Sequence, residues 1–226
     1  DADVLNESTS GGAFSAIADV WCDENYVIFG AEAEGLKIRH SFVTDKSEIG
    51  KFRRSKYSQS VIGDSFKDCK KFLNDGKKVL FSGTPCQIAG LKSFLKEKEY
   101  DNLLTVEVIC EGVPSPFFVR ALDTKINKEK KTSIKSLDYR YKDTNRWDYE
   151  VMRIAYSSTD KSTNGAIKRD RWFNPFWSIW LSHLMSRPSC YKCLYTTTNR
   201  VADISLGDLW GVHIYCPDLY NSDKGA

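Results

Sequence analysis

The chain has 226 residues, which is enough for one domain or for a large core with a subdomain. Hydrophobic residues make up 41% and charged residues 28%, the balance of an ordinary globular protein. The formal net charge of +3 is too small to indicate nucleic-acid binding, and no window reaches the length of a membrane span. We therefore expect no nucleic-acid partner and no membrane span.

The N-terminal part begins with a polar segment, 1–9, and then a helix whose apolar side chains share one face. The triplet SGG at 10–12 lies just before that helix. Bare backbone N–H groups at a helix start suit a phosphate, although a simple N-cap is the more common role of such a triplet. Two strands are expected on either side of Gly35. A basic and aromatic cluster at 53–57 suits a phosphorylated cofactor with a ring, but it is more often an exposed helix end.

The middle of the chain alternates helices with strands. The pattern predicts a helix at 65–76, a strand at 77–83, a helix at 86–98, a strand at 102–110 and a helix at 115–127. This spacing is typical of βαβ units, which implies adjacent parallel strands with helical crossovers.

The pattern changes in the third part of the chain. Residues 133–172 alternate apolar and polar side chains and predict an antiparallel subsheet. An aromatic helix is expected at 173–185, with one apolar face made of Phe173, Trp177, Trp180, Leu181 and Leu184. Since Phe176 and Ile179 lie on its other side, the helix is apolar nearly all round, so we expect a buried strut for the cysteine loop that follows, not a membrane contact.

Seven cysteines are spread over the chain: Cys22, Cys69, Cys86, Cys110, Cys190, Cys193 and Cys216. An odd number of cysteines, no visible export signal and a chain long enough to form its own core argue against a disulfide framework. We therefore expect reduced thiols and a cytoplasmic protein. Cys22, Cys69 and Cys216 are expected to be buried, which is the usual role of a single cysteine.

Cys86 and Cys110 occupy equivalent places, because each comes just after a predicted parallel strand and just before a helix. In an open α/β sheet that edge is where ligands bind, and neighbouring strands bring the two loops together. The helix start beside Cys86 favours its thiolate form. Cys190 and Cys193 form a C-x-x-C pair with chelating geometry. Together the four cysteines fit a structural zinc site or an iron–sulfur cluster, and spacing alone does not separate the two.

Two other roles explain less of the pattern. A thioredoxin-like redox pair would account for 190–193 but not for Cys86 and Cys110. A nucleophilic Cys86 would need a histidine base, and the three histidines stand in no informative relation to it in the sequence. The sequence therefore names no catalytic acid–base pair.

Six motifs occur in an order that resembles the coenzyme F-420 hydrogenase/dehydrogenase beta-subunit family: SGGAFSAIA, SKYSQS, VLFSGTPCQIAGLKSFL, CEGVPSP, RPSCYKC and ADISLGDLWG. The resemblance covers nearly the whole chain, and GTPCQIAGL together with RPSCYKC is its most specific part. The family consists of flavin- and iron–sulfur-containing electron-transfer proteins. The resemblance therefore implies FAD and a 4Fe-4S cluster, and it favours iron–sulfur over zinc.

The resemblance also implies site residues. The implied cluster ligands are Cys86, Cys110, Cys190 and Cys193. The residues that fall in segments resembling the flavin site are Ser10, Gly11, Gly12, Lys56, Tyr57, Gln59, Ser60, Gly83 and Thr84. Two departures limit what is carried over: relatives often have a ferredoxin-like segment ahead of SGG, and the family's usual histidine after Cys110 is Glu111 here.

We expect an α/β protein with a parallel βαβ core, a β-rich insertion and a C-terminal helix plus cysteine-rich cluster segment. These parts are 1–127, 128–172 and 173–226 of one family domain. The expected function is an oxidoreductase subunit that passes electrons between a soluble hydride or electron carrier, deazaflavin-like or other, and a redox partner such as a ferredoxin or a hydrogenase or dehydrogenase subunit. The alternative is a non-redox, zinc-stapled binding or assembly subunit that keeps the family fold.

Overall fold

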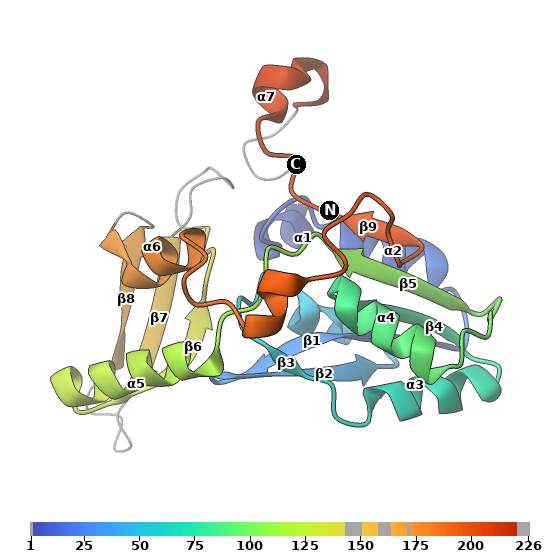
Figure 1. The fold of residues 1–226 in the computed structure, drawn as a ribbon, viewed down its shortest axis with the longest axis horizontal. Coiled ribbons are helices and arrows are strands. Elements are labelled where there is room, and N and C mark those ends of the chain that lie inside the picture. Colours follow the sequence, from blue (N-terminus) through green and yellow to red (C-terminus); the bar gives the residue numbers. More distant parts are fainter. Residues whose placement is uncertain (1, 143–150, 158–163, 171–172, 221–226) are drawn as a thin grey trace.

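The computed structural model describes residues 2–142, 151–157, 164–170 and 173–220. Two units lie side by side: a main unit built on a six-stranded sheet and a small unit built on a three-stranded sheet (Figure 1). The first elements are α1 (Ala2–Glu7), α2 (Ala13–Trp21), β1 (Tyr26–Glu34), β2 (Lys37–Val43), η1 (Lys46–Phe52), β3 (Ser60–Val61), α3 (Ser65–Asn74), β4 (Lys78–Gly83), α4 (Pro85–Phe94), β5 (Leu103–Val108) and α5 (Pro116–Lys130). The later elements are β6 (Ser133–Asp138), β7 (Val151–Ser157), β8 (Asn164–Asp170), α6 (Pro175–Leu181), η3 (Pro188–Lys192), β9 (Ile204–Leu206), α7 (Val212–Tyr215) and η4 (Pro217–Leu219). The predicted α/β class is confirmed.

The six-stranded sheet has the strand order β3-β2-β1-β4-β5-β9. β1 pairs with β4, β4 with β5 and β5 with β9 in parallel, whereas β1 and β2 form an antiparallel hairpin around Gly35. The connection from β4 through α4 to β5 is the parallel βαβ unit that the sequence predicts. In its register Gly83 is level with Glu107, so the loops after β4 and β5 leave the same edge of the sheet.

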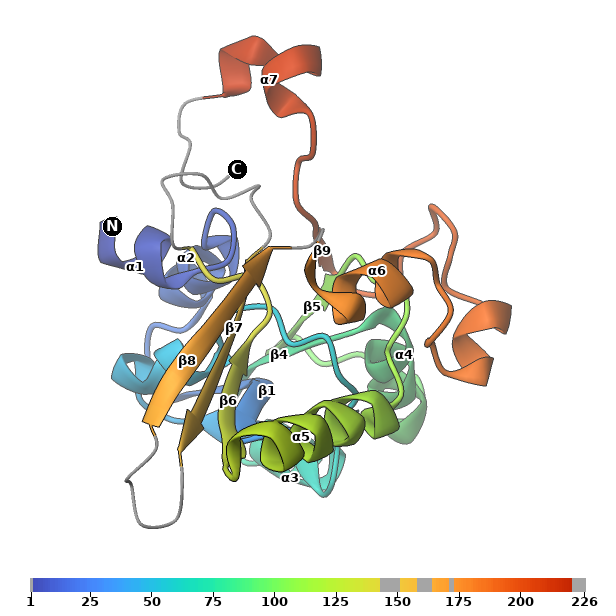
Figure 2. The same ribbon diagram turned by 90° about the vertical axis from the view of Figure 1, so that its left-hand side faces the viewer.

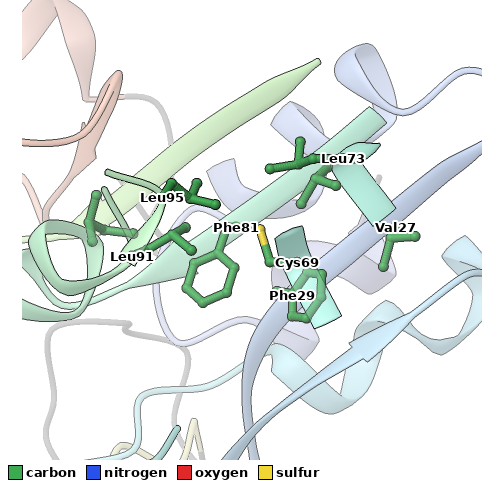
Figure 3. Packing of buried hydrophobic residues seen from close by; sticks show 9 residues of the cluster. Val27, Phe29, Cys69, Leu73, Phe81, Leu91 and Leu95 are labelled. Carbon is green, nitrogen blue, oxygen red and sulfur yellow. The ribbon is translucent and has the colours of Figure 1, made fainter. Parts of the chain in front are cut away.

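Both faces of the large sheet are covered, because successive side chains of a strand point to opposite sides. Phe29 and Phe81 stack with ring centroids 5.1 Å apart and pack with Cys69 in the core beneath α3 and α4 (Figure 3). Ile28 and Leu80 point the other way, into a core shared with α2 and η1. Burial on both faces explains why the central strands are continuous apolar runs.

The small unit contains the antiparallel sheet β6-β7-β8, with α5 packed against it (Figure 2). The Asp123 carboxylate of α5 accepts a hydrogen bond from the Ile134 N–H of β6 at 2.8 Å, and Ile126 is buried in the same core as Ile134. By these contacts α5 belongs with the small sheet, although the sequence groups it with the core at 1–127. Three strands of the antiparallel subsheet predicted at 133–172 are thus described, and residues 143–150, 158–163 and 171–172 of that range lie outside the described residues.

The aromatic helix is shorter than predicted and buries a different face. α6 has seven residues, so its periodicity does not extend to the ends of the predicted range 173–185. Its buried residues are Phe176, Trp177 and Trp180. The predicted burial of the two tryptophans is thus confirmed, but the predicted face is wrong at its exposed members, Phe173, Leu181 and Leu184.

The C-terminal segment with α7 stands away from both sheets (Figures 1 and 2). Cys216 in this segment is exposed, so the prediction that it is buried is wrong. Cys22 and Cys69 are buried, as predicted. Among the described residues, no helix is long and apolar enough to cross a membrane.

Candidate functional site

The two strand-end cysteines lie at the edge of the sheet where β4 and β5 end. Cys86 is the second residue of α4 and is exposed, with its Sγ 3.2 Å from Thr84 Oγ1. Cys110 follows the last residue of β5 by two positions and is half-buried, and the Gly112 N–H donates to its Sγ at 3.4 Å. Since β4 and β5 are paired in parallel, the two cysteine loops are neighbours, as the sequence predicts.

The C-x-x-C pair is held against the Cys110 loop by backbone contacts. Cys190 is part of η3 and Cys193 is its C-cap, in the orange turn between the two units in Figure 1. Just before η3, Ser186 forms an antiparallel bridge with Pro114, which follows the Cys110 loop. Two backbone hydrogen bonds of 2.9 and 3.0 Å flank this bridge. The segment that leads into this turn is therefore paired with the backbone four residues beyond Cys110, and we call such a contact a fastening point.

Gly112 lies inside this contact and has to be a glycine. Its φ of +116° is in the region that other residues rarely adopt. A Cβ at this position would lie 2.9 Å from Ser186 Oγ and 3.5 Å from Cys190 Cβ. The absence of a side chain thus lets Ser186, in the segment that leads into the Cys190 turn, lie closely against the Cys110 loop.

The four predicted ligands lie in one region, because β4 and β5 end at the same edge and the Pro114–Ser186 bridge holds the C-x-x-C turn beside Cys110. Burial raises the pKa of the Cys110 thiol, the Gly112 N–H lowers it, and repulsion from Cys86, Cys190 and Cys193 raises it again. The other three sulfurs are therefore close enough to act on Cys110. In the described part of the chain, no three His, Cys, Asp or Glu side chains form a group that could hold a metal ion. The four thiols share a region without being gathered around one point.

The donor set suits two kinds of group. Four cysteine thiolates are the usual ligands of a 4Fe-4S cluster and also of a structural zinc ion. All four are free thiols, and none is fully buried. By their chemistry these residues fit either group, and an iron–sulfur cluster here would lie near the surface, where a partner protein can approach.

Two of the segments that resemble a flavin site lie next to each other. The Ser55 N–H donates to Thr9 Oγ1 at 2.8 Å, which joins the start of the segment at 56–60 to the one at 10–12. Gly12 is the N-cap of α2 and has a φ of +78°. Because glycine has no side chain to cap the helix, the first amide N–H groups of α2 suit an anionic acceptor such as a phosphate. Ser10 is half-buried and Gly11 is exposed beside it.

The Lys56 side chain makes its hydrogen bonds within its own loop. Its Nζ donates hydrogen bonds of 2.7–3.1 Å to three backbone carbonyls, those of Phe52, Arg53 and Arg54. Burial lowers the pKa of Lys56 to about 8, while the charge of Glu32 opposes that shift. All three ammonium protons are thus used within the loop, so Lys56 shapes this segment and does not offer its charge to a phosphate.

Tyr57 joins the same segment to the small unit. Its ring packs edge-on against Trp180, Trp177 and Tyr139, with centroids 4.8, 5.1 and 5.7 Å away. Gln59, two residues further on, is exposed. The 56–60 segment therefore bridges the two units and leaves Gln59 as its outward-facing polar side chain.

A buried hydrogen-bond network joins Ser60 to the third flavin-like segment. The Gln87 amide donates to Ser60 Oγ at 2.8 Å and accepts from the Thr84 N–H at 2.9 Å. The His40 ring lies between Ser60 Oγ, 2.9 Å from Nδ1, and the Ser82 carbonyl, 3.0 Å from Nε2. A carbonyl only accepts, so Nε2 carries the proton and the Ser60 hydroxyl donates to Nδ1. Burial lowers the pKa of His40, which favours this neutral form.

Sequence analysis gives no role to His40, Glu107 or Arg200, although all three lie next to the candidate site. The alternation of β2 gave a usable signal for His40, because it puts this residue on the buried face. Gly83, at the end of β4, lies against the same network: a Cβ there would be 3.2 Å from the Gln87 side chain. Glu107 and Arg200 form an ion pair across 93 positions, which no local pattern reveals.

Comparison with known proteins gives a family and a shared fold. Residues 76–226 match the family described as the C terminus of the beta subunit of coenzyme F420 hydrogenase/dehydrogenase. Among solved structures, one similar chain comes from the F420-reducing NiFe hydrogenase complex of Methanosarcina barkeri, with a TM-score of 0.55 and 16% sequence identity. The match covers 92% of this chain and 67% of that one, and at this identity it shows a shared fold. No curated protein matches the chain.

Proposed function

This chain belongs to the coenzyme F420 hydrogenase/dehydrogenase beta-subunit family, and we propose that it is a flavin- and iron–sulfur-dependent electron-transfer subunit of an oxidoreductase. It takes electrons from, or gives them to, a soluble hydride or electron carrier, deazaflavin-like or other, and exchanges them with a redox partner protein. The similar fold of a chain from a hydrogenase complex supports a partner subunit. The seven free cysteines support a reducing compartment such as the cytoplasm.

The observation that carries the proposal is that four cysteines from three separate loops lie in one region at the edge of the sheet. Cys86 and Cys110 come from neighbouring strand ends, and the C-x-x-C pair is fastened against them. Packing alone gives no reason to bring four partly exposed thiols together, whereas a cluster requires it. We propose Cys86, Cys110, Cys190 and Cys193 as its ligands.

The flavin site is proposed along the three joined segments at 10–12, 56–60 and 83–84. The amide groups at the start of α2 would receive a phosphate, and Gln59 is placed to reach outward. Lys56 and the His40–Ser60–Gln87 network would hold the backbone of the site in shape. When bound, FAD would exchange a hydride or an electron pair with the small carrier, and a 4Fe-4S cluster would exchange single electrons with the partner protein.

Single cysteine variants test the ligand proposal. Serine replaces each of the four proposed ligands in turn, and Cys216→Ser serves as the matched control because Cys216 is also an accessible free thiol. After anaerobic reconstitution with iron and sulfide, we expect each ligand variant to hold much less iron per chain than the wild type, and the control to hold the same amount. Full iron content in two or more of the ligand variants would contradict the proposal.

A further inference from the structure

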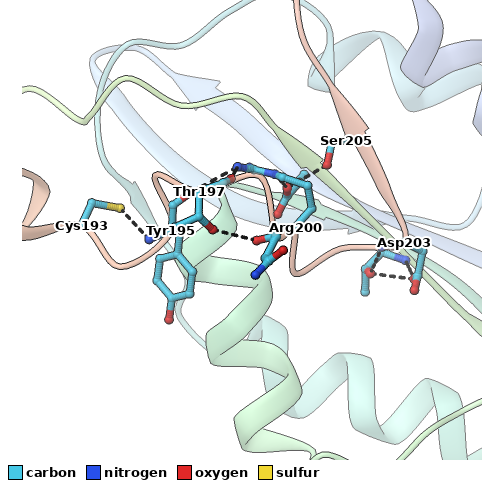
Figure 4. Close-up of polar contacts among 9 residues, drawn as sticks. Cys193, Tyr195, Thr197, Arg200, Asp203 and Ser205 are labelled. Atoms are coloured by element: carbon cyan, nitrogen blue, oxygen red, sulfur yellow. Dashed lines mark hydrogen bonds and ion pairs between the residues drawn. The ribbon is translucent and has the colours of Figure 1, made fainter.

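The segment between the C-x-x-C pair and β9 is fastened to β5 at two points. At the first, Asp203 Oδ2 accepts hydrogen bonds of 2.7 Å from both the N–H and the hydroxyl of Thr105, and the Asp203 N–H donates back to Thr105 Oγ1 at 3.0 Å. At the second, Arg200 forms an ion pair with Glu107 (Figure 4). Thr105 and Glu107 lie on the same face of β5, two residues apart. The second point is therefore the one nearer to Cys110.

The Arg200–Glu107 pair is enclosed mainly on its carboxylate side. The Glu107 side chain is fully buried and that of Arg200 is 25% exposed. Glu107 Oε1 also accepts a hydrogen bond of 2.8 Å from Ser205 Oγ, while its Oε2 has no hydrogen-bond partner among the described residues. A buried carboxylate needs an opposite charge, so Arg200 is held at a fixed place above the end of β5.

The same guanidinium organises the loop that leaves the C-x-x-C pair. Arg200 Nη1 donates to the carbonyls of Tyr195 and Thr197 at 3.2 and 3.0 Å. The Tyr195 N–H in turn donates to Cys193 Sγ at 3.4 Å. A continuous set of contacts thus runs from the Cys193 sulfur through Tyr195 and Arg200 to Glu107, three residues before Cys110.

We propose that Glu107 and Arg200 are positioning residues that set the distance between Cys193 and Cys110 in the ligand set. This inference rests on the proposed function, because the distance between the two sulfurs matters only where both cysteines hold the same cluster. Neither residue is a ligand. Their effect is exerted through the backbone of β5 on one side and through the Tyr195 peptide on the other, as for outer-shell partners that orient metal ligands.

The first test compares cluster retention with folding. The variants are Glu107→Gln and Arg200→Lys. The lysine keeps the positive charge but cannot reach Glu107 and both carbonyls with one planar group. Thr105→Val is the matched control, since it removes the two hydroxyl hydrogen bonds at the other contact on the same strand and leaves the backbone N–H bond to Asp203. Iron loss to a chelator is timed under anaerobic conditions, and thermal melting is measured on the iron-free chains. We expect iron loss to become about 10-fold faster or more in the first two variants. Retention in the control should stay close to that of the wild type.

A purely structural pair gives a different result. In that case iron retention follows the melting temperature across all the variants, the control included, and this outcome overturns the inference. Equal retention in wild type and Arg200→Lys overturns it as well.

A second test needs no iron and so separates this inference from the proposed function. The short bifunctional thiol reagent dibromobimane is applied to the iron-free chain, and the link between Cys110 and Cys193 is quantified by peptide mapping. The inference predicts a clear loss of this link in Arg200→Lys but not in Thr105→Val, and an unchanged yield in Arg200→Lys refutes it. If the wild type takes up no iron yet loses the link on substitution, the proposed function fails while the positioning role stands.

Discussion

Replacing Trp177 with alanine tests how the small unit is held together. The Trp177 side chain is fully buried, and its ring meets those of Tyr57, Trp180 and Phe176 with centroids 5.1, 5.5 and 5.7 Å away. Removing a buried tryptophan costs about 3–5 kcal/mol in transfer and cavity terms. Its indole N–H has no hydrogen-bond partner among the described residues. Removing this buried, unsatisfied donor therefore offsets the destabilisation by about 1 kcal/mol. We therefore expect Trp177→Ala to lower the free energy of unfolding by about 2–4 kcal/mol.

Equilibrium urea unfolding, followed by tryptophan fluorescence and by circular dichroism, measures this change. Trp177→Phe is the matched variant: it keeps most of the ring and removes the unpartnered N–H, so it should cost much less than alanine. Phe173→Ala is the exposed control on the same segment and should change stability by less than about 0.5 kcal/mol. Equal losses in the free energy of unfolding for Trp177→Ala and Phe173→Ala would show that burial does not determine the loss.

Three further predictions concern single sites. Burial lowers the pKa of His40, so below about pH 6.5 the unfolded chain gains a proton that the folded chain does not. The free energy of unfolding should therefore fall from pH 7.5 to pH 5, and it should fall less in His40→Gln. Equal pH dependence of the two chains in urea unfolding would contradict this. Gly12 and Gly76 both have positive φ, but only Gly12 has neighbours within 4 Å of an added Cβ. Gly12→Ala should thus destabilise the chain by about 1–3 kcal/mol more than Gly76→Ala in the same assay. Burial raises the pKa of Cys22 to about 11 and of Cys69 to about 12, so mass spectrometry should find both alkylated only after unfolding, and rapid labelling of either in the native chain would count against their burial.

The parts that the sequence predicts well depend on local patterns. The apolar runs of β4 and β5 and the helix between them are periodic over short windows, and parallel pairing of the two strands follows from the crossover. Because parallel neighbours end at the same edge, the amino-acid pattern alone is enough to place Cys86 and Cys110 together. The C-x-x-C pair is local too, whereas its position beside Cys110 depends on the bridge between Pro114 and Ser186.

The features that the sequence does not predict depend on distant contacts. The sequence presents Lys56 as an available cation, yet it donates hydrogen bonds to three carbonyls of its own loop. Two of the side chains that α6 buries, Trp177 and Trp180, pack against Tyr57, which comes from a segment more than a hundred residues away. The pairing of Glu107 with Arg200 likewise follows from the docking of β9 beside β5, a strand of only three residues whose partner no periodicity reveals.

The central claim is that the four cysteines hold an iron–sulfur cluster in a chain that also binds flavin. The most direct measurement is metal and flavin analysis of anaerobically prepared protein, combined with electron paramagnetic resonance after reduction. We expect close to four iron atoms and four sulfides per chain, as a 4Fe-4S cluster requires, with FAD that remains bound through gel filtration. We also expect a one-electron signal from the reduced cluster. Folded protein that contains zinc in place of iron, or that has neither iron nor flavin after reconstitution, would contradict the claim.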